Sequence, residues 1–247
     1  KAELKAEIRT KLQTIVTDPA KADIILVLWG DGTMLDAIHK LYKYNIPFLG
    51  INCGTLWFLL NDINDVQQIP NWLSNVEVIT EPFLQWAFID TAWVHHNTYA
   101  INDIMINDDV KKFPEFTISK KDKSLPAFHG SMLLLSSAIW SSWYRANNFW
   151  QQIPVWTNTI GVMGIISRPF DSKLLQWNIP HTITINSPRK AIDAWIDWEH
   201  KCIKNIASLT IQYSEETFSL LFIKNGQYKS FAEKSNHLFA QKFEKAF

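Results

Sequence analysis

The segment that decides the fold covers residues 24–51 and reads IILVLWGDGTMLDAIHKLYKYNIPFLGI. It opens with a continuous apolar run over residues 24–28, which is typical of a strand buried on both faces of a parallel sheet. Residues 30–33 interrupt this run, apolar side chains then recur at helical spacing over residues 34–42, and a second apolar run follows at 47–51. The segment predicts a βαβ unit. Its right-handed crossover places the turn at 30–33 at the carboxyl edge of the sheet, where α/β proteins bind ligands.

The rest of the chain shows other patterns of apolar and polar residues. An amphipathic pattern over residues 7–16 predicts an N-terminal helix, and residues 231–247 look helical again. Between them, after about residue 79, alternating and β-branched segments predict a β-rich region. The expected strands cover residues 116–119, 132–136, 182–185, 207–213 and 218–223. We therefore predict an α/β domain over residues 1–99, a β-rich domain over residues 100–230, and a C-terminal helix that packs back on the first domain.

Composition limits the class of protein. Apolar residues make up 47% of the chain and charged residues 19%, which is ordinary for a globular protein. Lys plus Arg and Asp plus Glu both number 24, so the basic excess of a nucleic-acid-binding protein is missing. No apolar run approaches the ~20 residues of a membrane helix. Cys53 and Cys202 have no metal-binding spacing. We expect a soluble cytoplasmic protein that binds neither nucleic acid nor membrane and has no metal site of its own.

Four turns and loops carry polar residues that could do chemistry. The first, residues 30–33, reads GDGT, where two glycines let a phosphate approach the backbone and Thr33 is a good N-cap for the helix. Taken alone, it is equally well a tight structural turn. The other three are residues 52–56 after the second strand, the pair Asn102 and Asp103 between strand formers, and the hydroxyl-rich residues 136–144. Each of these, taken alone, is more often an ordinary turn, bulge or loop.

In combination, these pieces resemble the NAD kinase family in order and spacing. The family carries G-G-D-G-T, G-I-N-x-G-x-L-G-F, L-N-[DE] and D-G-L-[IV]-x-S-T-P-T-G-S-T-A-Y, followed by R-P and D-G. This chain reads WGDGT at 29–33, GINCGTLWF at 50–58, IND at 101–103, SMLLLSSAIWSSWY at 131–144, RPF at 168–170 and DW at 197–198. The resemblance covers about residues 20 to 240. It implies the two-domain fold of that family and transfer of a phosphate to the 2′-hydroxyl of NAD.

The resemblance also implies roles for residues in the first predicted domain. Asp31 would be the general base that takes the proton from the NAD 2′-hydroxyl, since phosphoryl transfer needs a carboxylate near the attacking oxygen. Gly30, Gly32 and Thr33 would face nucleotide phosphates, and Phe58 would line the adenine pocket. The implied cofactors are ATP, or polyphosphate as an alternative donor, with Mg²⁺ or another divalent cation.

In the second predicted domain, Asn102 and Asp103 would hold ribose hydroxyls. The remaining residues of the implied dinucleotide site are Ser131, Ser142 and Tyr144. By the same resemblance, the protein assembles as a homodimer or homotetramer with sites partly shared between subunits.

The chain departs from the family where glycine is expected. Ser131 and Met132 replace the family's Asp-Gly, and tryptophan stands at family glycine positions at Trp29, Trp57, Trp140, Trp150 and Trp198. We expect these substitutions to weaken stability and activity. They indicate an altered sequence on a native scaffold or, alternatively, a divergent tryptophan-rich member. The functional alternatives are a dinucleotide-binding chain with impaired catalysis and a lipid kinase that shares G-G-D-G-T.

Overall fold

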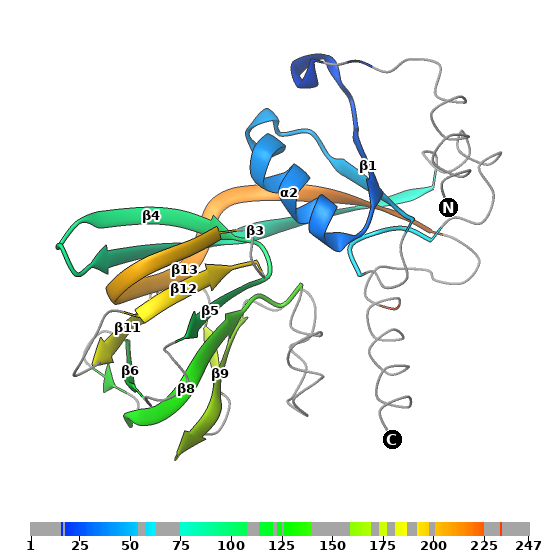
Figure 1. Ribbon diagram of the computed structural model, residues 1–247. Coiled ribbons are helices and arrows are strands. Elements are labelled where there is room, and N and C mark those ends of the chain that lie inside the picture. The colour runs from blue at the N-terminus through cyan, green and yellow to red at the C-terminus, as the bar shows by residue number, and fades with distance from the viewer. Residues whose placement is uncertain are drawn as a thin grey trace. The chain divides into compact units, whose positions relative to one another are not determined.

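The computed structural model describes residues 16, 18–53, 58–62, 75–107, 114–120, 123–124, 126–139, 159–168, 173–176, 181–186, 192–197, 201–224 and 233. The predicted terminal helices, over residues 7–16 and 231–247, lie outside this part of the chain except for Val16 and Glu233. The chain divides into two compact units, Lys1–Glu81 with Thr217–Phe247, and Pro82–Glu216. The helices and strands of each unit are labelled in Figure 1.

The first unit contains the βαβ element predicted from the sequence. β1 (Ile25–Trp29) and β2 (Phe48–Asn52) pair in parallel, with Ile25 opposite Phe48 and Trp29 opposite Asn52. α2 (Asp31–Leu41) connects them and buries the side chains at every third or fourth position, namely Met34, Leu35 and Ile38. Short 3-10 turns precede β1 (η1, Pro19–Lys21) and follow α2 (η2, Tyr42–Tyr44). The predicted α/β unit is confirmed.

The start of α2 differs from the prediction. Gly30 is the N-cap, with extended backbone (φ −133°, ψ 178°) and no side-chain cap bond, and the helix begins at Asp31. Thr33 therefore lies inside the first turn, and the expectation that it caps the helix is wrong. The backbone of Gly30 supplies the cap itself, because its carbonyl accepts the first helical hydrogen bond from the Met34 amide at 3.2 Å.

Glycine at position 50 has a packing role in this unit. A Cβ built there would overlap the Leu60 Cδ2 and Met34 Cε atoms, so only glycine lets these side chains pack directly against β2. The Asn61 side chain then ties the strands together: its Nδ2 donates to the carbonyls of Gly50 and Leu221 at 2.9 Å each, and its Oδ1 accepts from the Ile223 amide at 2.7 Å.

The second unit is built from β-strands. They are β4 (His95–Ala100), β5 (Asp103–Asn107), β6 (Glu115–Lys120), β7 (Lys123–Ser124), β8 (Phe128–Ser136), β9 (Thr159–Arg168), β10 (Lys173–Gln176), β11 (His181–Asn186) and β12 (Ile192–Ile196), with most of β3 (Val76–Asp90) and β13 (Lys201–Ile223). Every pairing whose register is known in this unit is antiparallel. The predicted β-rich lobe is confirmed.

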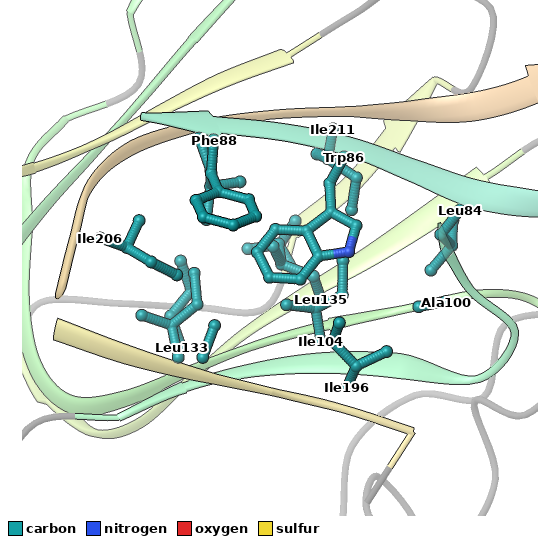
Figure 2. Close-up of a cluster of buried hydrophobic side chains, with 14 of the residues drawn as sticks. Leu84, Trp86, Phe88, Ala100, Ile104, Leu133, Leu135, Ile196, Ile206 and Ile211 are labelled. Carbon is teal, nitrogen blue, oxygen red and sulfur yellow. The ribbon is translucent and has the colours of Figure 1, made fainter. Parts of the chain in front are cut away.

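The strand order explains how this unit closes around a core. The order runs β10-β9-β8-β5-β12-β13-β11-β6-β7, and an additional pairing of β6 with β8 closes a ring. Buried side chains from strands of this ring, together with others from β3 and β4, form one apolar cluster, part of which Figure 2 shows around the labelled Trp86. Trp86 is fully buried and its indole lies 5.0 Å, centroid to centroid, from the Phe88 ring. Burial of side chains of this size supplies most of the stability of such a core.

Two predicted strands are one in the structure. The segments 207–213 and 218–223 both belong to β13, a strand of 23 residues. The polar residues between them neither break nor turn the chain, since no glycine or proline interrupts the run. The sequence predicts two strands because polar residues interrupt the alternation between residues 213 and 218.

The boundaries between the two units differ from the predicted domain boundaries because of β3 and β13. Both strands contribute to both units, which separate between Glu81 and Pro82 and between Glu216 and Thr217, whereas the sequence analysis placed the boundaries after residues 99 and 230. Residues 82–99 belong to the second unit because β3 pairs with β4 and supplies side chains such as Leu84 and Phe88 to its core. Within the described residues, no helix has the length and apolar character needed to cross a membrane.

Candidate functional site

The turn after β1 presents the N-terminus of a helix. Gly32 and Thr33 are exposed and Asp31 is half-buried. The amide groups of the first helical turn have no carbonyl partner within the helix, and they concentrate positive potential at this end. Among the described residues, no atom lies within 4 Å of a Cβ built on Gly30 or Gly32. Packing in this part therefore does not demand glycine, but a phosphate that approaches the backbone closely would.

The Asp31 carboxylate joins this turn to the turn after β2. Its Oδ2 accepts a hydrogen bond from the Phe58 amide at 2.8 Å, and its Oδ1 accepts one from the Leu59 amide at 2.9 Å. The Cys53 amide also donates to the Trp29 carbonyl at 2.8 Å. The two predicted turns at this sheet edge are thus held together by side-chain and backbone bonds. A carboxylate has about four lone-pair sites, so these two bonds leave Asp31 able to accept further donors.

Phe58 lies on the second of these turns. Its side chain is only 4% exposed, and its amide is one of the two donors to Asp31. Its expected position beside an adenine ring stays a prediction. Trp57, its neighbour, is outside the described residues.

In the second unit, Ile101 and Asn102 form a bend that leads into β5, whose first residue is Asp103. Asn102 and Asp103 are buried, at 2% and 6% exposure. The Asn102 carbonyl accepts from the Ser137 amide at 2.8 Å, whereas the buried side-chain Oδ1 of Asn102 has no hydrogen-bond partner among the described residues. A buried acceptor of this kind in a folded protein is normally satisfied by water or a ligand.

The end of β8 adds two hydroxyl groups to this bend. Ser136 stands opposite Asp103 in the register of β5 and β8, and Ser137 is the next residue. Both side chains are 2% exposed, and neither Oγ atom has a partner within the part of the chain that the structure describes. In that part, three polar atoms without a partner therefore belong to residues at the start of β5 and the end of β8. The sequence analysis noted the hydroxyl cluster but included neither serine in the site.

Ser131 does not belong to this group within one chain. It is buried on β8, but five residues separate it from Ser136, which corresponds to about 16 Å along an extended strand. Ser142 and Tyr144, like Trp140 and Trp198, lie outside the described residues.

Two residues that the sequence analysis did not place in the site support it. The Tyr213 hydroxyl accepts from the Ala138 amide at 3.4 Å and donates to the Thr159 carbonyl at 3.1 Å, so it holds the loop that follows β8. Asp197 binds the backbone of the bend at Asn102. The sequence showed Asp197 as part of a motif, but nothing in it revealed this contact, and Tyr213 carried no signal at all.

A hollow and a carboxyl group with a raised pKa also occur among the described residues. A polar cavity of about 390 Å³ adjoins Tyr213; it is lined by Gln85, Tyr99, Gln212, Tyr213, Ser214, Glu215 and Glu216. Burial raises the pKa of Glu81 to about 7. In the part of the chain that the structure describes, no three His, Cys, Asp or Glu side chains lie close enough together to hold a metal ion.

Comparison with known proteins gives one consistent answer. Residues 1–77 match the family described as the ATP-NAD kinase N-terminal domain. The NAD kinase of Rickettsia bellii is 28% identical over 217 residues, which cover 84% of this chain and 83% of that protein. The NAD kinase of Rickettsia prowazekii is 26% identical over 211 residues, covering 83% and 82%.

Two solved structures show the same fold. An NAD kinase from Archaeoglobus fulgidus in complex with ATP superposes with a TM-score of 0.71 at 17% identity, covering 99% of this chain and 93% of that one. Yeast NADH kinase complexed with NADH superposes with a TM-score of 0.70 at 15% identity, covering 88% and 67%. The likeness extends over both units.

Proposed function

The chain belongs to the NAD kinase family, and from this membership we propose that it transfers the terminal phosphate of ATP to the 2′-hydroxyl of NAD, giving NADP. The observation that carries the proposal is the joined pair of turns at Asp31, where a helix N-terminus and a carboxylate share one sheet edge. The lipid-kinase alternative has no support, because the relatives reported above are NAD kinases.

The phosphates of the donor bind at the start of α2. The open backbone at Gly30 and Gly32 admits them, and the amide groups and the exposed Thr33 hydroxyl donate hydrogen bonds. ATP is the expected donor because the Archaeoglobus relative of the same fold was solved with ATP, and polyphosphate is the other candidate. A divalent cation such as Mg²⁺, bound to the phosphates, neutralises the charge that develops during transfer.

Asp31 acts as general base. The 2′-oxygen of NAD forms a bond to the terminal phosphorus while its proton passes to an Asp31 oxygen, and the bond from that phosphorus to the bridging oxygen breaks, so that ADP leaves. The Phe58 and Leu59 amides hold the carboxylate in one orientation, which is the pre-positioning that a proton acceptor needs.

The other predicted site residues bind the dinucleotide. The unpartnered Oδ1 of Asn102 accepts from a ribose hydroxyl, and Asp103 holds a second hydroxyl. Phe58 provides an apolar surface for adenine. The other members of the site are Ser131, Ser142 and Tyr144.

Assembly and location belong to the same proposal. We place the protein in the cytoplasm as a homodimer or homotetramer, and sharing of sites between subunits would bring Ser131 to a neighbouring chain's dinucleotide. Cys53 and Cys202 are free thiols, in keeping with a reducing compartment. Light scattering on the purified protein measures the oligomeric state. A monomer at micromolar concentration would contradict the proposed dimer or tetramer.

The activity is tested by following NADP formation with a coupled NADP-specific dehydrogenase. Reactions with NAD and Mg²⁺ receive ATP or inorganic polyphosphate, and a third replaces NAD by NADH. We expect product with ATP and NAD, and none without Mg²⁺. Absence of NADP and NADPH from every reaction, with an active relative as control, contradicts the proposal.

A further inference from the structure

Asp197, the residue that follows β12, holds the backbone of the bend at Asn102. It is 4% exposed. Its Oδ1 accepts from the amides of Ile101 (3.1 Å), Asn102 (2.6 Å) and Asp103 (3.3 Å), and its Oδ2 accepts from the Ile101 amide at 2.9 Å. The Asp197 amide donates in return to the Asp103 carbonyl at 3.0 Å. One side chain thus receives hydrogen bonds from three successive amides of a segment more than 90 residues away in the sequence.

The backbone of Asp197 is in a conformation that L-residues adopt at a cost. Its φ is 46°, in the left-handed region, where aspartate and asparagine are tolerated better than other side chains. Glycine would relieve the backbone but would leave three buried amides without an acceptor. Strain that persists at a buried polar contact often marks a functional position.

The bend that Asp197 holds contains Asn102, whose side chain has a buried hydrogen-bond acceptor. The Asn102 carbonyl is bonded to the Ser137 amide, while the buried Asn102 Oδ1 and Ser137 Oγ have no partner among the residues that the structure describes. With the backbone fixed on both sides, by Asp197 and by Ser137, this acceptor and this hydroxyl are held ready for a bound partner. Pre-organisation of this kind lowers the entropy lost on binding.

We propose that Asp197 is a positioning residue for the dinucleotide: it fixes the bend 101–103 so that Asn102 Oδ1, together with Ser137 Oγ, receives the hydroxyl or amide donors of the bound NAD. The proposal rests on the proposed function, since it takes NAD as the ligand. It adds two residues, Asp197 and Ser137, to the site.

The second unit offers a matched control in Asp90, at the hairpin between β3 and β4. Its Oδ1 also accepts from two backbone amides, those of Ala92 (2.8 Å) and Val94 (2.9 Å), and its Oδ2 bonds with His96 Nε2 at 2.9 Å. Asp90 therefore stabilises a turn in the same manner, at a position with no unpartnered polar cluster beside it in the described residues. Asp90→Asn and Asp197→Asn change the same atoms.

The experiment compares the unaltered chain with Asp197→Asn, Asp90→Asn and Asn102→Ala. Hydrogen exchange by mass spectrometry reports on the amides of residues 101–103, and calorimetric titration gives the dissociation constants for NAD and for ATP. In Asp197→Asn we expect exchange at 101–103 to quicken and NAD binding to weaken by roughly 10-fold to 100-fold, as small displacements of positioned groups do. ATP binding should change by less than about twofold, since no ATP contact is lost.

The controls separate positioning from simple loss of stability. Asp90→Asn should leave both NAD binding and exchange at 101–103 as in the unaltered chain. Asn102→Ala should weaken NAD binding while the amides stay protected, and it serves as the second test if Asp197→Asn does not fold. The proposal is overturned if Asp197→Asn quickens exchange without weakening NAD binding, or leaves exchange unchanged. If the unaltered chain does not bind NAD, the proposed function fails and the ligand part of the inference with it, while the exchange data still decide whether Asp197 holds the bend.

Discussion

The turns at Asp31 and at Asp197 use the same device in different surroundings. In each, an aspartate carboxylate accepts hydrogen bonds from successive backbone amides of a segment distant in sequence. Asp31 is half-buried at the start of a helix, with glycines on both sides, whereas Asp197 is buried at the end of a strand. The comparison teaches that one interaction can serve two purposes: an accessible carboxylate can still take part in chemistry, while an enclosed one can only hold the backbone.

The tryptophan beside Asp31 gives the largest expected effect on activity. Trp29 is 55% exposed, and its φ of 158° lies at the limit of the region that favours glycine. An indole directly before the Gly30–Thr33 turn obstructs the approach of phosphates. We expect a chain with glycine at 29, 57, 140, 150 and 198 to melt at a higher temperature and to form NADP faster than the chain as it stands. Equal melting temperatures and equal turnover would show that these positions never required glycine.

The difference in burial predicts unequal losses of stability. Asp197→Ala leaves three buried amides without their acceptor, and we expect the free energy of unfolding to fall by about 3 kcal/mol or more. Asp31→Ala exposes two partly accessible amides to water, so the loss should be about 1 kcal/mol. Urea denaturation at neutral pH measures both. A larger loss for Asp31→Ala would reverse the comparison.

Glu81 extends the comparison to a carboxyl group whose pKa is changed by burial. Burial disfavours its ionised form and raises its pKa from 4.5 to about 7. Stability from this group is therefore fully present below pH 4.5 and is lost as the pH rises through about 7, a change of about 3 kcal/mol at most. Unfolding measured at about pH 5 and about pH 8 should show this fall, and Glu81→Gln should flatten it. The same slope in Glu81→Gln would assign the pH dependence to other groups.

The smallest expected effect comes from a second residue in the left-handed region. Trp93 has φ 64°, as Asp197 has φ 46°, but its side chain is 80% exposed at the hairpin between β3 and β4. Glycine is favoured at this point of such a hairpin. Trp93→Gly should therefore raise the free energy of unfolding by about 1 kcal/mol, whereas Asp197→Gly should lower it because the carboxylate is lost. Changes of the same sign in both variants would show that backbone conformation alone decides the outcome.

Trp93 extends the tryptophan pattern beyond the sequence motifs. Trp86 differs from Trp93, because it is fully buried and packs in the core of the same unit. One codon that the source cell reads as glycine, translated as tryptophan in this chain, would place the same residue at position 93 and at all the family glycine positions at once. Mass spectrometry of the peptide containing position 93, from the protein made in its own cell, distinguishes this origin from a divergent tryptophan-rich member.

Local patterns in the sequence predicted much of the fold. The run 24–28, the helical spacing after Gly32 and the second run at 47–51 each specify one element, because burial and backbone freedom act over a few residues there. The start of α2 was misplaced because Gly30 caps the helix with its backbone, without the side chain that a sequence pattern detects. β13 was predicted as two strands because polar residues between 213 and 218 interrupt the alternating pattern.

The candidate site could be proposed from its motifs, whereas the contacts of its residues could not be predicted. Asp31, Asn102 and Asp103 could be selected because they follow or precede strands in a specific order. The bonds from Asp31 to the Phe58 and Leu59 amides, and from Asp197 to the bend at Asn102, depend on the orientation of peptide groups 27 to 96 residues away. Backbone amides have no sequence signature, so only the folded chain reveals them.

The two aspartates are compared most directly by the kinetics of Asp31→Asn and Asp197→Asn, made in the chain with glycine at 29, 57, 140, 150 and 198. If Asp31 is the base, its substitution lowers kcat by roughly 10² or more and leaves the KM for NAD nearly unchanged. If Asp197 positions the dinucleotide, its substitution raises the KM for NAD and has the smaller effect on kcat. A near-parental kcat in Asp31→Asn, or the same pattern of change in both variants, would contradict the account.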